Sequence, residues 1–489
     1  MKILMINPAI VPGSKEIWAT GMKMDIQGGV SYIPRLAPMI LAALTPQEHS
    51  FKYIDEDHEL VDFDKVDADL IAITGMTTQA MRGYQLADEF RSKGYTVVIG
   101  GIHASSCPEE AALHADAVCT GEADGYWKIM LEDAQKGELK KFYNAKDYPQ
   151  PEEIISPRVD VINHSLYTTF PIQATKGCPF SCEFCCIKLT SGNKHRRKPI
   201  EQVVAEIKEL EKYNTGVYKK RYHFVDDNLY VNREYTIELL KAMIPLNIQW
   251  TGMGSSNIAQ DDEILKLIAE SGCRVFYIGF ESITEASLKE VNKNNKVEDY
   301  KLIAQKLIEF GIISAGYFIM GFDNDDETSV KRTVDFAIEN RIINPYFSIL
   351  TPLPSTPLYE RMKDKIFDTD WRHYGSLKCV YKPEKMTPEQ LEKGVYEAAY
   401  EVARLDLLKD HLKYFWSHGP WETNPRLTLR DRLVLLVTAS KMKKVKTSRD
   451  FLRWAAFYPK AVDLMQILAA AVYHAESFRY KNTETSEIK

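Results

Sequence analysis

Residues 171–355 contain six short apolar runs, and helical patterns separate each run from the next. The apolar runs lie at 171–175, 222–226, 248–253, 274–280, 314–320 and 346–351, and the helical patterns lie at 199–213, 232–243, 261–271, 298–310 and 326–340. Strands and helices that alternate at this spacing predict a parallel barrel or partial barrel. In such a barrel, the residues that carry chemistry gather at the carboxyl ends of the strands.

Three cysteines directly follow the first of these runs, at Cys178, Cys182 and Cys185. Thiolates this close in one loop can bind a single soft metal centre, and three are one fewer than a closed iron–sulfur cluster usually takes. One iron would therefore stay open to another ligand. The alternative is a structural zinc site with Cys186 as fourth ligand, but adjacent residues rarely reach one tetrahedral ion.

The spacing C-x3-C-x2-C, with the aromatic Phe184 before the last cysteine, resembles the signature of radical S-adenosylmethionine (radical SAM) enzymes. In that family the cysteines hold a 4Fe–4S cluster, and SAM binds the fourth iron. An electron from the cluster cleaves SAM to methionine and a 5′-deoxyadenosyl radical. The resemblance therefore implies Cys178, Cys182 and Cys185 as cluster ligands, with Phe184 packed beside the adenine of SAM.

Polar motifs at the expected strand ends are similar to the SAM-holding motifs of that family. They are Phe224-Val225-Asp226-Asp227-Asn228, Gly279-Phe280-Glu281-Ser282 and the stretch from Gly316 to Gly321. The resemblance places Asp226 or Asp227 near the amino group of SAM and Glu281 near its ribose or methionine part. Residues Ile319 to Gly321 would lie behind the adenine. For each acid the alternative is a helix N-cap or an ion pair, and no residue is assigned as catalytic.

Residues 1–140 also alternate between apolar strands and helices, which predicts a doubly wound parallel α/β sheet. The expected strands are Lys2–Asn7, Phe51–Asp55, Asp69–Thr74, Thr96–Ile99 and Asp116–Thr120, and the expected helices are Pro34–Leu44 and Thr77–Ser92. Such a sheet binds ligands beyond the carboxyl ends of its strands. The fingerprint G-x-G-x-x-G is missing, so the sequence does not support a dinucleotide site.

Placed before a radical SAM motif, this sheet resembles the cobalamin-binding domain of one branch of that family. The residues expected to face cobalamin are Thr74, Gly100, Gly101, His103, Gly121 and Glu122. Many such domains carry D-x-H-x-x-G after the first strand, but here that loop begins Asn7-Pro8 and contains no histidine. The resemblance therefore implies cobalamin without a protein histidine ligand, and His103 as a loop residue that packs near the corrin.

Two further observations concern the same domain. The Asp55-Glu56-Asp57-His58 stretch contains a D-x-x-H fragment after the second strand, and its charges predict a solvated turn. A domain that has kept the fold and lost the cofactor is the alternative to a cobalamin site, because fold alone does not imply function.

The expected order of domains is a cobalamin-binding-like domain at 1–140, a linker at 141–170, the barrel at 171–355 and a mostly helical domain at 356–489. In the last domain, Thr387 and Pro388 predict the start of a helix that runs to about Leu408. Residues 425–460 hold ten basic residues against two acidic ones, a local net charge of +8, and a helical apolar pattern follows at 461–478. This pattern favours a solvated face over a helical bundle, with peripheral contact to an anionic membrane as the alternative.

Composition limits the classes of function. A net charge of −6 offers no nucleic-acid signature. Half of the eight cysteines lie within nine residues, which favours a metal site in a reducing, cytoplasmic compartment over a set of disulfides. The first apolar run is too short for a signal peptide, and no apolar segment is long enough to span a bilayer.

The resemblance implies an enzyme that transfers a methyl group to an unactivated carbon, in the group of the hopanoid C2-methylase and the anaerobic magnesium-protoporphyrin ester cyclase. The 5′-deoxyadenosyl radical would take a substrate hydrogen, and the carbon radical would take a methyl group from methylcobalamin. The alternatives are a radical cyclase or oxidase of the same architecture, and an iron–sulfur carrier or sensor. The expected partners are a small-molecule substrate and an electron donor such as flavodoxin or ferredoxin. A lipid or isoprenoid substrate would agree with the apolar residues Tyr317 and Phe322 at the expected barrel mouth and with the basic segment at 425–460. Peptides, pigments and antibiotic precursors are the alternatives.

Overall fold

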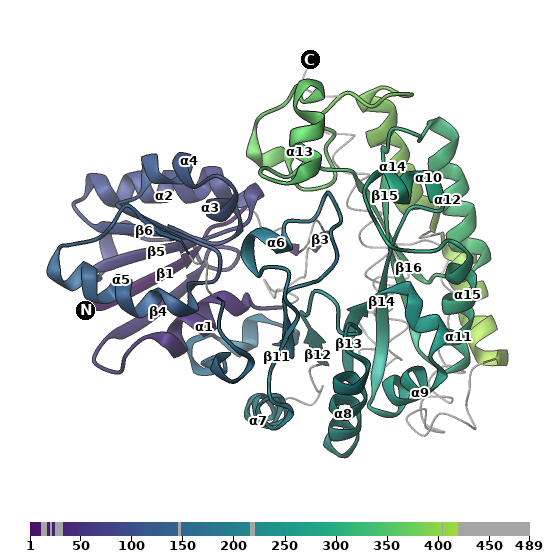
Figure 1. Cartoon of the computed structure of the whole chain (residues 1–489), viewed down its shortest axis with the longest axis horizontal. Helices are drawn as coiled ribbons and strands as arrows, with labels where there is room; N and C mark the ends of the chain where they lie inside the picture. The colour runs from purple at the N-terminus through teal and green to yellow at the C-terminus, as the bar shows by residue number, and fades with distance from the viewer. Residues whose placement is uncertain are drawn as a thin grey trace. The chain divides into compact units, whose positions relative to one another are not determined.

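A computed structural model describes residues 1–10, 17–19, 22–24, 33–144, 148–215, 221–402 and 404–418 (Figure 1). The chain forms two compact units. The first unit is Met1–Asn214 with Thr351–Val380, and the second is Thr215–Leu350 with the segment that begins at Tyr381. We call Thr351–Val380 the return segment. The domain boundaries expected from the sequence were placed by motifs along the chain, whereas these two units are defined by compactness. The expected boundaries therefore stay predictions.

The first unit begins with a six-stranded sheet in the order β4-β1-β5-β6-β7-β8. Its strands are β1 (Lys2–Asn7), β4 (Ser50–Asp55), β5 (Leu70–Thr74), β6 (Thr96–Gly100), β7 (Ala117–Thr120) and β8 (Phe142–Asn144). Every neighbouring pair is parallel, so the chain crosses over between strands, mostly through helices. The predicted doubly wound sheet is therefore confirmed.

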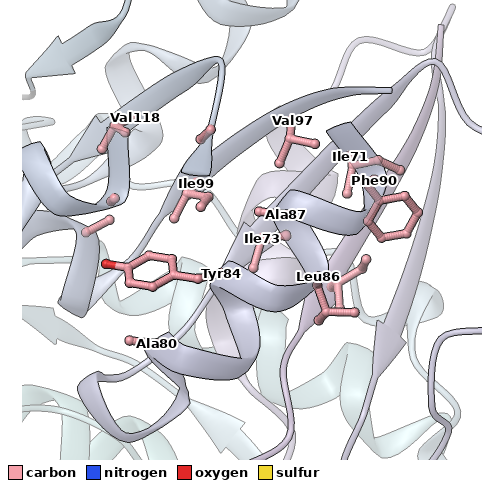
Figure 2. Close-up of a cluster of buried hydrophobic side chains, with 14 of the residues drawn as sticks. Ile71, Ile73, Ala80, Tyr84, Leu86, Ala87, Phe90, Val97, Ile99 and Val118 are labelled. Atoms are coloured by element: carbon pink, nitrogen blue, oxygen red, sulfur yellow. The ribbon is translucent and has the colours of Figure 1, made fainter. Parts of the chain in front are cut away.

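Helices cover both faces of this sheet. They are α1 (Leu36–Leu44), α2 (Ala80–Ser92), α3 (Ile102–Ser106), α4 (Pro108–His114) and α5 (Trp127–Lys136). Because successive strand residues point to opposite faces, β1 supplies both hydrophobic cores. Leu4 and Ile6 join the core under α2 and α4, part of which Figure 2 shows. Ile3 and Met5 join the core that Trp127 of α5 closes.

The cysteine loop and its flanking elements also belong to the first unit. These elements are β9 (Thr169–Ile172), β10 (Thr175–Lys176), α6 (Ile187–Thr190), β11 (Arg196–Arg197) and α7 (Ile200–Glu211). Strands β10 and β11 pair in antiparallel fashion, with Lys176 opposite Arg196. This short ribbon closes the base of the loop that carries the cysteines. The return segment adds α13 (Pro357–Met362) and the 3-10 turn η10 (Trp371–His373).

The second unit contains parallel strands in the order β16-β15-β14-β13-β12. Their bounds are β12 (Arg221–Phe224), β13 (Trp250–Gly254), β14 (Cys273–Glu281), β15 (Ile313–Met320) and β16 (Asn344–Ile349). Between them lie α8 (Arg233–Met243), α9 (Asp262–Glu270), α10 (Glu285–Glu290), α11 (Glu298–Glu309) and α12 (Glu327–Glu339). The alternation of strands and helices expected of a partial barrel is confirmed.

One face of these strands packs on the helices. Phe280 of β14 meets Tyr300 of α11 with ring centroids 4.7 Å apart, and Phe318 of β15 lies 6.3 Å from Phe336 of α12. Phe280 and Phe318 are fully buried. Aromatic residues that bury so much apolar area dominate the stability of such a core.

Several boundaries differ from the expected ones. The helix expected from Thr387 to about Leu408 is two helices, α14 (Pro388–Val402) and α15 (Leu405–His418). The expected capping box is present, since Gln390 N–H donates to Thr387 Oγ1 and the Gln390 side chain accepts from Thr387 N–H. The expected helix at Thr77–Ser92 begins with a separate 3-10 turn, η2 (Thr77–Gln79). Strand β8 lies within the expected linker.

The basic segment 425–460 and the helical pattern at 461–478 lie outside the residues that the structure describes. Within the described part of the chain, no helix combines the length and the apolar character needed to cross a membrane.

Candidate active site

Cys178, Cys182 and Cys185 all lie in the loop between β10 and α6, and each is half-buried. The loop begins at Gly177, whose φ of +80° favours glycine; a Cβ there would lie 2.4 Å from the carbonyl oxygen of Lys194. The Cys185 amide donates to the Cys182 carbonyl at 3.2 Å, which tightens the turn between these two residues. None of the eight cysteines, all of them described, forms a disulfide. Three thiols on one short loop fit the ligand set of a cluster with one open iron.

Two other residues of this loop have distinct positions. Phe184 lies between the second and third cysteines and is half-buried, so it can contact a ligand of the cluster. Cys186 is the N-cap residue of α6 and therefore begins the next element. The prediction that Phe184 packs on adenine stays a prediction.

The return segment holds the cysteine loop from another part of the sequence. The Leu358 amide of α13 donates to the Glu183 carbonyl at 3.1 Å, and Arg361 pairs with the Glu183 carboxylate at 3.0 Å. Both contacts fall between Cys182 and Cys185. Helix α13 therefore restrains the loop at its centre.

The carboxyl ends of β5, β6 and β7 bring together the residues expected to face cobalamin. Gly101 has a φ of +95°, and a Cβ there would lie 2.5 Å from Oγ1 of Thr74. Gly121 has a φ of +74°, and its N–H donates to Oγ of Ser105 at 2.9 Å. Since only glycine tolerates both the conformation and the close approach at Gly101, these three strand ends form one tight rim.

A pocket opens beside this rim, between the ends of β5 and β6 and the start of α2. With its open mouth included, the empty space is about 260 Å³. Ile73, Ala80, Tyr84 and Ile99, which Figure 2 labels in the core, also line this pocket. The rest of its lining consists of Pro8, Gly75, Met76, Gln79, Gly83, Gly100, His103 and Ala104. Because the lining is mostly apolar and contains several glycines, a ligand that lies on this edge of the sheet could approach the backbone closely.

His103 lies in helix α3 and is 4% exposed, so the expectation of a loop residue is wrong. The cause is that Ile102–Ser106 forms a single short turn of helix directly after Gly101. Nε2 of His103 lies 2.9 Å from the Tyr84 hydroxyl and 3.8 Å from the Glu110 carboxylate. Among the described residues, Nδ1 of His103 has no hydrogen-bond partner. The histidine is therefore buried in the pocket wall with one polar atom unsatisfied.

His103, Cys107 and Glu110 also place their potential ligand atoms within 4.8 Å of one another. The nearby His103 side chain, and then the hydrogen bond from Trp371, hold the pKa of Glu110 below its usual range. Burial and the charge of Glu110 raise the pKa of Cys107 to about 12. A protonated thiol is a weaker metal ligand than a thiolate.

The Asp55–His58 stretch is not the solvated turn expected from its charges. Asp55 and Glu56 are 9% and 4% exposed. Arg82 pairs with Glu56 at 2.7 Å, and Tyr167 donates to Asp55 at 2.9 Å. These partners lie far away in the sequence, so the local charge pattern could not reveal them.

In the second unit, the expected SAM-binding residues lie at the carboxyl ends of three strands. Asp226 is buried and Asp227 is half-buried, and both follow β12. Glu281 ends β14 with a φ of +62° and forms a 2.7 Å ion pair with Lys293. An acid buried this deeply is stable only when paired or bound.

The third SAM-related stretch ends β15. Ile319 is half-buried, and Gly321 has a φ of +98°. Its N–H donates to the Asp325 carboxylate at 2.9 Å, and its carbonyl accepts from the Tyr381 hydroxyl. The turn after β15 is therefore fixed from both sides.

Sequence reasoning missed three residues that shape the first unit: Lys176, Arg196 and Trp371. Lys176 and Arg196 both form ion pairs with Glu122, and Trp371 donates to Glu110 at 2.8 Å. The basic run Lys194-His195-Arg196-Arg197-Lys198 was a visible signal. Nothing local in the sequence identifies its acidic partner.

Comparisons with known proteins agree with this geometry. A family model described as the radical SAM superfamily matches residues 172–337. The bacteriochlorophyllide d C-12(1)-methyltransferase of Chlorobaculum tepidum is 33% identical over 78% of this chain and 85% of that protein. The C-8(2)-methyltransferase of the same organism is 32% identical over 86% of this chain and 94% of that protein.

Among solved structures, the radical SAM methyltransferase TsrM from Kitasatospora setae, with cobalamin and a 4Fe–4S cluster bound, matches with a TM-score of 0.64 and 14% identity. The match covers 91% of this chain and 99% of that one. This similarity concerns the fold. The family match and the identity to the two methyltransferases lead to one conclusion: the chain belongs to the radical SAM superfamily and is a radical SAM enzyme.

Proposed function

We propose that this protein is a cobalamin-dependent radical SAM methyltransferase that acts on an unactivated carbon of a small molecule. The observation that carries the proposal is that one compact unit contains both the three-cysteine loop and the glycine-lined pocket. Two relatives named as methyltransferases are 33% and 32% identical to this chain over 78% and 86% of its length.

In the first unit, Cys178, Cys182 and Cys185 would hold the 4Fe–4S cluster, with the fourth iron left for SAM. The rim formed by Thr74, Gly101 and Gly121 would lie against cobalamin, and the apolar pocket would take a flat part of that cofactor. Together the cofactors supply the radical and the methyl group, while the protein orients them and excludes water.

In the second unit, Asp226 and Glu281 are the buried acids that would bind SAM. The Glu281 carboxylate is already paired with Lys293 through one oxygen. Its other oxygen can accept a hydrogen bond from a ribose hydroxyl. Asp226 would face the cationic amino group, for which a buried carboxylate is a strong partner.

The substrate would be a small molecule that combines apolar surface with an unactivated carbon. Phe322 does not contribute to its recognition, because this side chain is only 1% exposed. Tyr317 is half-buried and belongs to a cluster of three tyrosine rings on the second unit, with Tyr277 and Tyr346. The names of the relatives make chlorophyll-type tetrapyrroles the first candidates, and isoprenoid lipids are the second. An electron donor such as flavodoxin or ferredoxin would reduce the cluster.

The test is an assay with anaerobically purified, cluster-reconstituted protein. The protein would be supplied with cobalamin, a reductant and SAM that carries a deuterated methyl group, and then challenged with tetrapyrroles and isoprenoid lipids. The proposal predicts 5′-deoxyadenosine and a product that has gained the deuterated methyl group. A product that loses hydrogen or gains oxygen would identify a cyclase or oxidase. A cluster that never cleaves SAM would identify a carrier or sensor.

A further inference from the structure

The rim of the pocket and the cysteine loop are joined by a buried group of charged side chains. We propose that Glu122 is a positioning residue that couples the two cofactor sites through ion pairs with Arg196 and Lys176. This inference rests on the proposed function, since it concerns the same two sites. Glu122 would act through these two side chains and not by contact with a cofactor.

The carboxylate of Glu122 is fully occupied. Its two oxygens lie 2.5 Å and 2.9 Å from the terminal nitrogens of Arg196, and Nζ of Lys176 lies 3.4 Å away. The same lysine nitrogen is 3.4 Å from Asp124. The four side chains are between 7% and 10% exposed. Two acids and two bases therefore neutralise each other in a buried site, where an uncompensated charge would be costly.

The two basic residues, Lys176 and Arg196, lie at the two ends of the cysteine loop. Lys176 is the second residue before Cys178, and its backbone lies opposite that of Arg196 in the β10–β11 ribbon. Arg196 also donates to the Ser191 carbonyl at 2.8 Å, and its guanidinium lies 4.9 Å from the ring of Tyr148. One carboxylate thus fixes both the entry and the exit of the loop.

On the other side, Glu122 continues the rim. Its neighbour Gly121 donates to Ser105 of α3, the helix that also carries His103 in the pocket wall. The Gly121–Ser105 hydrogen bond and the Glu122–Lys176 ion pair, connected through the backbone, therefore link the pocket wall to Lys176, the residue before Gly177. Both contacts lie within the first unit.

Removing the charge of Glu122 has two consequences. The loop loses its anchor on the rim, so its amides exchange faster with solvent. Lys176 and Arg196 are then balanced by Asp124 alone, which leaves excess positive charge beside the loop. Positive charge stabilises the reduced, more negative form of a nearby cluster, so the midpoint potential rises.

The experiment compares Glu122→Gln with the conservative variant Glu122→Asp. Glu206→Gln is the matched control. It also removes the charge of a carboxylate that lies 2.7 Å from a buried lysine, Lys198. Both of these residues follow the cysteine loop in the sequence, so their ion pair does not join the loop to the rim. Hydrogen exchange of residues 178–190 would be measured on the apoprotein, and the cluster midpoint potential on reconstituted protein. The ratio of 5′-deoxyadenosine to methylated product would be the third readout.

We expect Glu122→Gln to increase exchange in the loop by about tenfold, which corresponds to the loss of one strong interaction. It should also raise the midpoint potential and form several molecules of 5′-deoxyadenosine for each methylated product. Glu122→Asp should restore part of each effect, and Glu206→Gln should leave exchange of the loop unchanged. If Glu122→Gln does not fold, Arg196→Lys, which keeps the charge and loses the two-point contact, should give the faster exchange.

Unchanged exchange and potential in Glu122→Gln would overturn the inference, as would an equal response in Glu206→Gln. Failure of the proposed function has a different signature. In that case the wild-type protein forms no methylated product, while the shifts in exchange and potential still appear.

Discussion

The indole Nε1 of Trp371 donates a 2.8 Å hydrogen bond to the carboxylate of Glu110, which lies 261 residues earlier in the chain. The Trp371 ring also meets the His103 ring edge-on, with centroids 5.4 Å apart. The return segment therefore contacts His103, one of the residues that line the pocket, while the lining itself comes entirely from residues between Pro8 and Ala104. The α/β domain of the first unit is continuous in space but not in sequence.

Trp371→Phe keeps an aromatic ring against His103 and removes the indole N–H. Because Glu110 is a third exposed and can recruit water, we expect a loss of about 1 kcal/mol of unfolding free energy. Trp371→Ala should lose more, since the ring contact disappears as well. Chemical denaturation measures both. Arg372→Ala is the control: its partner Asp370 lies in the same turn, and an ion pair of an exposed side chain contributes little to stability, so the free energy of unfolding should stay close to that of wild type.

Gly101→Ala should disrupt the rim of the pocket. The new methyl group would lie 2.5 Å from Thr74 Oγ1 at a φ of +95°, so both a clash and backbone strain of about 1–2 kcal/mol are introduced. Gly94→Ala is a close control, because Gly94 has a φ of +86° but nothing within 4 Å of its Cβ position. We expect cobalamin binding to weaken in Gly101→Ala alone. Equal loss in both variants would show that only backbone strain matters.

Asp57 should make the first unit less stable as pH rises. Burial, and then the charge of Asp55, raise the pKa of Asp57 from 3.8 to about 7. Between these values the folded state binds more protons than the unfolded state, so stability falls from about pH 4 to about pH 7 and then levels off. Asp57→Asn removes this dependence and should be more stable than wild type at about pH 8, but not at about pH 4.

Thermal unfolding across this pH range measures the effect of Asp57. The exposed carboxylate of Asp64 supplies the control variant Asp64→Asn, which should follow the wild-type curve. If the stability of Asp57→Asn changed with pH in the same way as that of wild type, the raised pKa of Asp57 would not be the cause of the pH dependence.

Glu281→Gln should weaken SAM binding by about tenfold, which is the weakening expected when one charge-assisted hydrogen bond is lost. Glu281 is 7% exposed, so water cannot replace the lost interaction. Anaerobic equilibrium dialysis with reconstituted protein measures the dissociation constant. Glu285→Gln changes an exposed carboxylate that only accepts the Val297 amide, and it should leave SAM affinity unchanged. An unaltered affinity in Glu281→Gln would remove this residue from the SAM site.

The parts of the fold that could be predicted from the sequence are those with a strong local pattern. Strand β1 has its expected bounds, because four apolar residues stand between Lys2 and Asn7-Pro8. The short helix α3 was missed, since five residues after two glycines carry no periodicity. Helix α4 did have a signal, namely Pro108 at its first position and two acids in its first turn.

The residues of the candidate site likewise divide into those that a local sequence pattern reveals and those that it does not. Cys178, Cys182 and Cys185 could be identified because the ligands of one centre lie within eight residues. The pairing of Glu122 with Arg196 could not, because 74 residues separate the two charges and many others of each sign compete. The burial of Asp55 and Glu56 was missed for the same reason. Long-range charge pairing depends on the completed fold and not on local propensity.

The measurement that tests the central claim most directly is 5′-deoxyadenosine formation by Cys182→Ala and Cys186→Ala, beside wild type, after anaerobic cluster reconstitution. Both variants remove one thiol from the same nine-residue stretch. The account predicts that Cys182→Ala loses SAM cleavage and that Cys186→Ala retains it, since Cys186 begins α6. SAM cleavage that persists in Cys182→Ala, or that is lost equally in both variants, would contradict a cluster held by Cys178, Cys182 and Cys185.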